Sequence, residues 1–182
     1  MTQFPIDYNA VRKAFANIIT KVTGLVCVLE EPTYQNAPRP ALPYFSFKII
    51  TPGARYADDA TFYSGGGEIQ NHSGPRKMTV SFHCYAQDQE TAYNFMALWQ
   101  ASLDTFDTQE LLLNANISVW LIGTVADLSQ LLNTGYEGRS HMDTDFGIGS
   151  FITEDQGEID TAHISGTIDT NNGIVNDEFT AP

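Results

Sequence analysis

The chain of 182 residues is poor in basic residues, in cysteine and in long apolar runs. Nine Lys and Arg stand against 22 Asp and Glu, which gives a formal net charge of -13, and no Lys or Arg follows Arg139. Proteins that grip duplex DNA place Lys and Arg on its phosphates, so this balance argues against sequence-specific binding of nucleic acid. It is compatible with an acidic wall along which DNA slides without sticking.

Long apolar runs and targeting features are also missing. The longest apolar stretches, such as Leu111–Leu113, are far shorter than the roughly 20 residues that cross a bilayer. The N-terminus lacks the basic and apolar regions of a secretion signal. We therefore expect a protein that is made and kept in a cytoplasm and has no membrane partner.

Cysteine and catalytic motifs are equally scarce. Cys27 and Cys84 each lie within an alternating apolar run, which makes them small buried hydrophobes rather than redox or catalytic groups. The sequence contains no Gly-x-Ser-x-Gly, His-Glu-x-x-His or Gly-x-Gly-x-x-Gly motif. We predict that the protein is not an enzyme and uses no cofactor.

One spacing deserves comparison with a metal site. His141, Asp143 and Asp145 alternate along a predicted strand, so they share a face and lie about 6–7 Å apart along it. One imidazole and two carboxylates are a possible ligand set for a divalent cation, and a metal-dependent enzyme is an alternative. We favour a solvated polar face opposite Met142 and Phe146, because no second cluster of His or Cys is evident. We predict no catalytic, cofactor-binding or metal-binding residue.

Helical spacing of apolar residues predicts the helices. It runs through residues 7–24 and again through residues 88–103, with residue types typical of helix caps at the start of both segments. A shorter helical piece is expected around residues 109–113. Residues 127–132 are predicted to form a brief helix or turn.

Period-two alternation and short apolar runs predict the strands. Strands that follow one another along the chain favour an antiparallel or mixed β-sheet with helices packed on one face, which is an α+β fold with long loops and a C-terminal arm. We predict a single domain over residues 1–170 and a flexible acidic tail over residues 171–182. The loops are proline-rich at residues 30–43 and polar at residues 52–75. The predicted strands are residues 25–29, 44–51, 76–86, 117–123, 136–153 and 159–168.

Several of these pieces together resemble a known family. Pro38–Ile49 is a proline-rich stretch that leads into a long strand, and Met78–Ala86 is a core strand followed directly by a helix. Tyr136-Glu137-Gly138-Arg139 then leads from a turn into a long final strand. In this order the pieces are similar to the neck terminator, or tail-completion, proteins of tailed bacteriophages. The resemblance covers residues 6–170.

The resemblance implies a structural protein of the virion that is assembled in the host cytoplasm. Such a protein forms a ring, expected to hold six subunits, which terminates the tail tube and joins it to the head connector. The implied partners are copies of itself, the tail tube, the sheath and the head-completion protein. The resemblance also implies a final hairpin between Met142–Phe151 and Ile159–Ile168. Another head–tail adaptor, a minor tail protein and a module of a phage-derived secretion or contractile apparatus stay open as alternatives.

Two sets of candidate site residues follow from the implied ring. The first is an acidic face that lines a channel, so that DNA passes without specific binding; it consists of His141, Asp143, Asp145, Glu154, Asp155 and Glu158. The second is a set of residues expected at the contacts between subunits; it consists of Arg39, Tyr44, Arg55, Trp120, Tyr136 and Arg139.

Overall fold

A computed structural model describes residues 5–30, 38–57, 59–64, 69–132, 135–155, 162–170 and 173–181. The chain divides into two compact units. The first holds residues 1–60 and 72–152, and the second holds residues 61–71 and 153–182. The boundary that the sequence predicts near residue 170 falls within the second unit.

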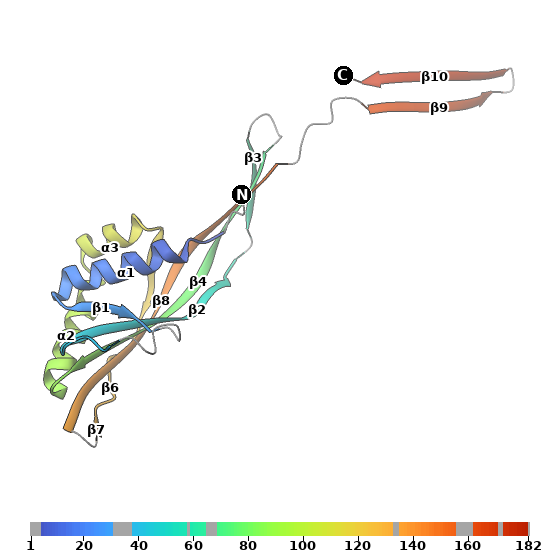
Figure 1. The fold of residues 1–182 in the computed structure, drawn as a ribbon. Helices are drawn as coiled ribbons and strands as arrows, with labels where there is room; N and C mark the ends of the chain where they lie inside the picture. Colours follow the sequence, from blue (N-terminus) through green and yellow to red (C-terminus); the bar gives the residue numbers. More distant parts are fainter. Residues whose placement is uncertain are drawn as a thin grey trace. The chain divides into compact units, whose positions relative to one another are not determined.

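The first unit is built on a mixed β-sheet with the strand order β1-β2-β4-β8-β5 (Figure 1). β1 runs parallel to β2, whereas β2 pairs antiparallel with β4, and β8 pairs antiparallel with β5. The short strands β6 and β7 pair with the first part of β8, and β3 pairs with β4. The bounds are β1 (Val26–Leu29), β2 (Tyr44–Arg55), β3 (Ala60–Ser64), β4 (Ile69–Ala86), β5 (Ile117–Ile122), β6 (Ala126–Asp127), β7 (Gln130–Leu132) and β8 (Gly135–Asp155).

Three helices pack on one face of this sheet: α1 (Tyr8–Thr23), α2 (Gln89–Ser102) and α3 (Phe106–Leu113) (Figure 1). The Asp7 carboxylate caps α1 by accepting hydrogen bonds from two backbone N–H groups of its first turn, and Gly24 ends the helix with a φ of 73°. The Asp88 carboxylate caps α2 by accepting from the backbone N–H of Thr91 at 2.8 Å. None of the described helices combines the length and the hydrophobicity needed to span a bilayer.

The hydrophobic core lies between the helices and the sheet. Phe15 of α1 is fully buried, and its ring centroid lies 5.8 Å from Phe47, 5.8 Å from Phe82 and 4.9 Å from Phe146. Trp99 of α2 is also fully buried, with its ring 5.3 Å from Phe82. These tilted and edge-on aromatic contacts join one helix to three neighbouring strands, so they fix the helices on the sheet.

The other face of the sheet carries the alternate residues of the same strands, and we call it the open face. Met142 and Phe146 of β8 point into the core with no exposed surface, and the exposed Asp143 lies on the opposite side. The predicted sidedness of β8 is therefore confirmed. The open face includes Tyr44, Ser46 and Lys48 of β2, Lys77, Thr79, Ser81, His83 and Tyr85 of β4, and Arg139, His141, Asp143 and Asp145 of β8.

The α+β fold class is confirmed, as are the three helices, but two local predictions are wrong. The described part of residues 52–75 is mostly strand rather than loop, because β2 continues to Arg55 and is followed by β3 and the first part of β4. These strand segments carry mostly polar residues. The sequence there lacks the hydrophobic alternation by which a half-buried strand is predicted. Residues 127–132 form strand β7 and the end of β6, rather than a helix. Between them the Asp127 carboxylate accepts from the backbone N–H of Ser129, an Asx turn that resembles a helix cap.

The last part of the chain forms a hairpin of its own. β9 (Ala162–Thr170) pairs antiparallel with β10 (Gly173–Ala181). The predicted pairing of residues 142–151 with residues 159–168 is wrong, because β8 pairs with other strands of the main sheet. β10 lies where the sequence predicts a tail without regular structure. The dipeptide Asn172-Gly173, which is typical of hairpin turns, was the available signal.

Candidate interaction surfaces

The first candidate surface is the open face of β8. The alternation of this strand brings His141 and Asp143 side by side, with 2.9 Å between His141 Nε2 and Asp143 Oδ1. Ser81 Oγ of β4 lies 2.9 Å from the same imidazole nitrogen. The side chain of Asp143 is 48% exposed, so it is the outermost carboxylate of this group.

Asp145 is on the same face but is bound by the neighbouring strand. Its Oδ2 lies 2.7 Å from Lys77 Nζ, and its Oδ1 accepts a hydrogen bond from Thr79 Oγ1 at 2.6 Å. Burial acts to raise the pKa of Asp145, but the hydrogen bonds from Lys77 and Thr79 together outweigh it and lower the pKa. The carboxylate is therefore ionised at neutral pH, and Lys77 balances its charge.

The metal-site alternative gains no support from this geometry. Within the described parts of the chain, no group of three or more His, Cys, Asp or Glu side chains is arranged to hold a metal ion. His141 and Asp143 form a pair, whereas Asp145 is bound by Lys77. The spacing along the strand is as predicted, but the three side chains do not meet at one point.

The remaining predicted acids belong to the second compact unit. Glu154 lies exposed near the end of β8. Asp155 is the last residue of that strand, and its side chain is outside the described part of the structure, as is all of Glu158.

A stack of aromatic and cationic groups lies on the same open face. Tyr44 and Tyr85 are paired across β2 and β4, with ring centroids 4.9 Å apart and an angle of 14° between the rings. The guanidinium carbon of Arg139 lies 5.0 Å from the centroid of the Tyr85 ring, and Arg39 Nη1 lies 3.4 Å from Glu137 Oε2. Three predicted contact residues thus gather here, but Tyr44 is only 5% exposed and belongs to the scaffold.

His83 is a member of this stack that the sequence analysis missed. Its Nδ1 lies 3.3 Å from Arg139 Nη2, and its ring centroid lies 4.8 Å from that of His141. A guanidinium can only donate, so His83 Nδ1 accepts and the imidazole is neutral. Burial lowers the pKa of His83 to about 4. In the sequence, His83 alternates with Ser81 and Tyr85 on the side of the strand that faces away from the core. This pattern was the signal that could have placed His83 on the open face.

The second candidate surface is a groove beside Trp120. β5 contains a bulge, since Val119 pairs with Phe146 and Leu121 with Asp145, which leaves Trp120 as the extra residue. The indole lies over Gly147 so closely that a Cβ at that glycine would overlap the ring. A side chain at position 147 would therefore push Trp120 out of its place.

The groove is lined by one aromatic residue, Trp120, which contacts a second ring outside the lining. The ring of Tyr56 lies 4.6 Å from that of Trp120, and the two residues are 67% and 38% exposed. Trp and Tyr are the residues most often found at the energetic centres of protein interfaces. The groove has a volume of about 430 Å³ and is lined by Ser73, Gly74, Pro75, Leu113, Asn116, Ile117, Ser118, Trp120, Gly147, Ile148 and Gly149.

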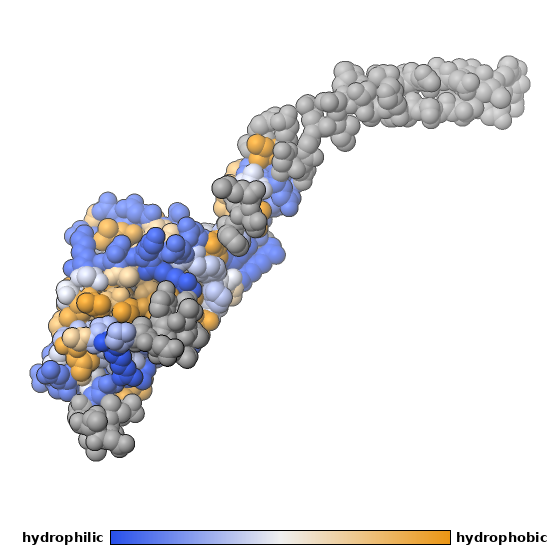
Figure 2. Space-filling model, viewed as in Figure 1, coloured by the Kyte–Doolittle hydropathy of each residue, from blue (hydrophilic) through white to orange (hydrophobic). Residues whose placement is uncertain are grey.

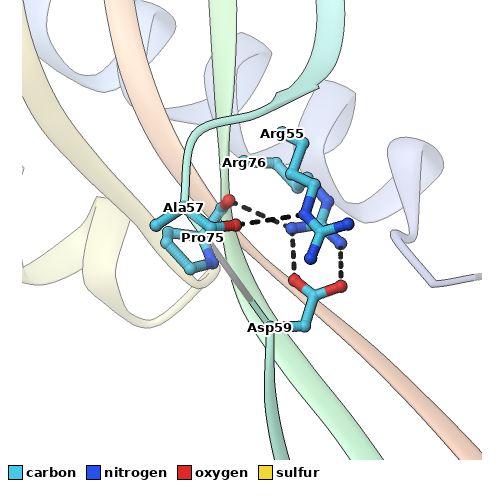
Figure 3. Close-up of polar contacts among 5 residues, drawn as sticks. All are labelled: Arg55, Ala57, Asp59, Pro75 and Arg76. Carbon is cyan, nitrogen blue, oxygen red and sulfur yellow. Dashed lines mark hydrogen bonds and ion pairs between the residues drawn. The ribbon is translucent and has the colours of Figure 1, made fainter.

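An ion pair holds the turn that carries Tyr56 (Figure 3). Arg76 Nη1 and Nη2 bind Asp59 Oδ1 and Oδ2 at 2.6 and 2.8 Å, and this hydrogen bonding lowers the pKa of Asp59. Arg55 lies beside the pair and donates from Nε to the backbone oxygen of Ala57 at 3.3 Å (Figure 3). Arg55 is exposed, and its role as a contact residue stays a prediction. The side chain of Tyr136, the last predicted contact residue, lies outside the described part of the structure.

The described residues thus combine an α+β scaffold, a groove beside Trp120 and ion pairs on the open face. Residues 9–172 match the family model described as phage neck terminator protein. The chain therefore belongs to the family of phage neck terminator proteins. A comparison with curated proteins finds no match.

Proposed function

We propose that the chain assembles into a ring of six subunits that terminates the tail tube and joins it to the head connector. The family match over residues 9–172 carries this proposal. A phage neck protein is a structural part of the virion, and a cyclic ring gives every subunit two different contact patches. The proposed partners are copies of the chain, the tail tube, the sheath and the head-completion protein, with assembly in the host cytoplasm.

The Trp120 groove is the proposed contact patch for a neighbouring subunit. Large side chains at or beside this groove are well exposed, with Leu113 of its lining at 61% and Tyr56, which contacts Trp120, at 67%. Burying one such side chain is worth about 1.5–3 kcal/mol, so a partner that fills the groove would gain several such contributions. Arg55 adds a cation at its edge.

The open face of β8 is the proposed channel wall. Asp145 is balanced by Lys77 and Asp143 contacts His141, so this part of the face is only weakly acidic. Such a wall repels DNA mildly, and its cation Lys77 is already paired with Asp145, so DNA passes without specific binding. An electron microscopy map with His141, Asp143 and Asp145 on the outer rim of the ring would exclude this part of the proposal.

The proposed role requires no catalysis, cofactor or metal. In support, the three candidate metal ligands do not act together: His141 pairs with Asp143, whereas Asp145 is bound by Lys77. Calorimetric titration of the full chain with Mn²⁺ and Zn²⁺ tests this point. Stoichiometric binding at micromolar metal, abolished by His141→Ala, would contradict it.

Particles that lack the chain test the main proposal. Negative-stain images of such particles are expected to show tails of irregular length and heads separate from tails, and a plasmid-borne copy is expected to restore joined particles. Tails of uniform length with unjoined heads would favour another head–tail adaptor. Normal, joined particles would overturn the proposed function.

A further inference from the structure

The acidic hairpin at the end of the chain has no role in the function proposed so far. β9 and β10, of 9 residues each, form a two-stranded sheet of their own. A hairpin with only two strands is marginally stable in water and gains stability when it packs on a further surface. The hairpin therefore needs a surface on which to dock.

The charge of the hairpin indicates which kind of surface it can dock on. β9 and β10 hold three acidic residues, Asp169, Asp177 and Glu178, and no Lys or Arg. A segment of one charge sign associates fastest and most specifically with a surface of the opposite sign, and like charges suppress the wrong partners. The docking surface should be cationic and free of carboxylates.

Helix α1 has a surface of this kind. Residues 8–29 contain no Asp or Glu, whereas α2 and α3 contain no Lys or Arg, so α1 is the cationic helix. Figure 2 shows a largely hydrophilic surface over α1. Four of its exposed residues recur every four positions and so form one line along the helix. They are Asn9, Lys13, Asn17 and Lys21, and the exposed Ala10 and Thr20 lie next to this line.

The chemistry and length of this line suit a strand edge. Lys13 and Lys21 form no ion pair with another described residue, so both ammonium groups can pair with carboxylates. An Asn amide both donates and accepts, which suits the unpaired N–H and C=O groups along the edge of a hairpin. A helix of 16 residues is about 24 Å long, close to the roughly 30 Å of a nine-residue strand.

We propose that the acidic hairpin β9–β10 docks on the exposed face of α1 in a second copy of the chain. This inference rests on the proposed ring, in which every subunit gives a hairpin to one neighbour and receives one from the other. The hairpin and α1 belong to different compact units, which is compatible with exchange between copies.

Zero-length carbodiimide cross-linking of a mixture of ¹⁴N- and ¹⁵N-labelled full chains tests the contact directly. The expected products join Lys13 or Lys21 to Asp169, Asp177 or Glu178, and mass spectrometry shows mixed isotopes within one product. Products that join only residues of one chain would overturn the proposal. So would a chain that stays monomeric in sedimentation at millimolar concentration.

Charge reversal supplies the second test. Lys13→Glu with Lys21→Glu, or Asp177→Lys with Glu178→Lys, is expected to weaken self-association about tenfold, and the two pairs combined are expected to restore it. Lys48→Glu, an exposed cation of β2, and Asp107→Lys, an exposed acid of α3, are the matched controls. Unchanged self-association in the α1 variant would overturn the proposal, and so would a combined variant that is no better than either parent.

The two proposals fail separately. Particles carrying the α1 variant that still have tails of normal length joined to heads, without cross-links between α1 and the hairpin, would remove only this inference. Normal particles in the complete absence of the chain would remove the neck function itself.

Discussion

His83 and Arg139 show how a single contact across strands decides a protonation state. The two residues lie on the neighbouring strands β4 and β8, and the guanidinium donates toward the buried imidazole at 3.3 Å. A protonated imidazole would lose this acceptor and stand beside a fixed cation. The neutral ring is thus part of the structure of the open face.

This arrangement predicts a stability that depends on pH. The folded chain holds the pKa of His83 at about 4, below its ordinary 6.5, so the unfolded chain binds the extra proton between these values. The free energy of unfolding therefore rises with pH across this window. Above pH 6.5 the destabilisation from His83 is absent, and on acidification to pH 4 the free energy of unfolding falls by up to about 3 kcal/mol.

Urea unfolding of the wild type and of His83→Gln across this window measures the effect. The variant is expected to lose most of the dependence between pH 4 and 6.5, because Gln does not titrate. Parallel curves for wild type and His83→Gln would contradict the neutral imidazole.

Gly147 is a second residue whose identity is explained by one contact. Gly147→Ala is expected to displace the Trp120 indole, lower the free energy of unfolding by about 1–3 kcal/mol and change the tryptophan emission. Gly149→Ala is the matched control, because a Cβ at that position meets nothing within 4 Å. Equal stability and emission in the two variants would show that Trp120 does not lie on Gly147.

At the scale of elements, the helices follow directly from local chemistry. The Asp88 carboxylate accepts from both the backbone N–H and the hydroxyl of Thr91, each at 2.8 Å, and these bonds lower its pKa. The same local rules explain why α1 begins after Asp7 and ends at Gly24. Capping signals and apolar spacing were therefore sufficient to predict α1 and the start of α2, whereas α3 was predicted only over its last part.

Loss of the α2 cap gives a prediction at this scale. Asp88→Ala is expected to reduce the free energy of unfolding by about 1 kcal/mol, since two groups of the first turn lose their acceptor. Thermal or urea unfolding measures the change. Asp104→Ala, which removes an exposed acid outside the cap, should have little effect. A similar loss in both variants would mean that net charge, rather than the cap, matters here.

The strands were harder to predict than the helices. β4 was predicted from Arg76, but it begins at Ile69, because its polar first half pairs with β3 instead of burying a face. β6 and β7 are too short to show any period, and their strand character comes from pairing with β8. A ladder of backbone hydrogen bonds can hold a strand that has no side-chain pattern.

At the scale of the whole molecule, two surfaces are proposed to take part in assembly. The open face of β8 is polar and largely paired within the chain, whereas the groove beside Trp120 leaves two aromatic rings open to a partner. The interface candidates divide accordingly: Arg39, Tyr44 and Arg139 lie with the polar stack, and Arg55 and Trp120 lie with the groove.

The groove gives the prediction at this scale. Trp120→Ala is expected to leave the chain folded but to reduce ring assembly on tails at least tenfold, because an interface loses its aromatic anchor. Negative-stain counting of capped tails and sedimentation of the free chain measure this. Phe106→Ala, at a residue of α3 that is 77% exposed, is the control and should assemble normally. Normal ring assembly by Trp120→Ala would exclude the groove as a subunit contact.

The sequence alone determined which side chains of β8 face the core, where α1 begins and ends, where α2 begins, and the family to which the chain belongs. Periodicity and capping involve residues a few positions apart, so they are visible in a linear pattern. Only the tertiary structure decided that Asp145 binds Lys77, that Trp120 lies on Gly147 and that β9 pairs with β10 instead of β8. The first two contacts join residues far apart in the chain, and all three depend on strand order and register, which no local pattern of residues specifies.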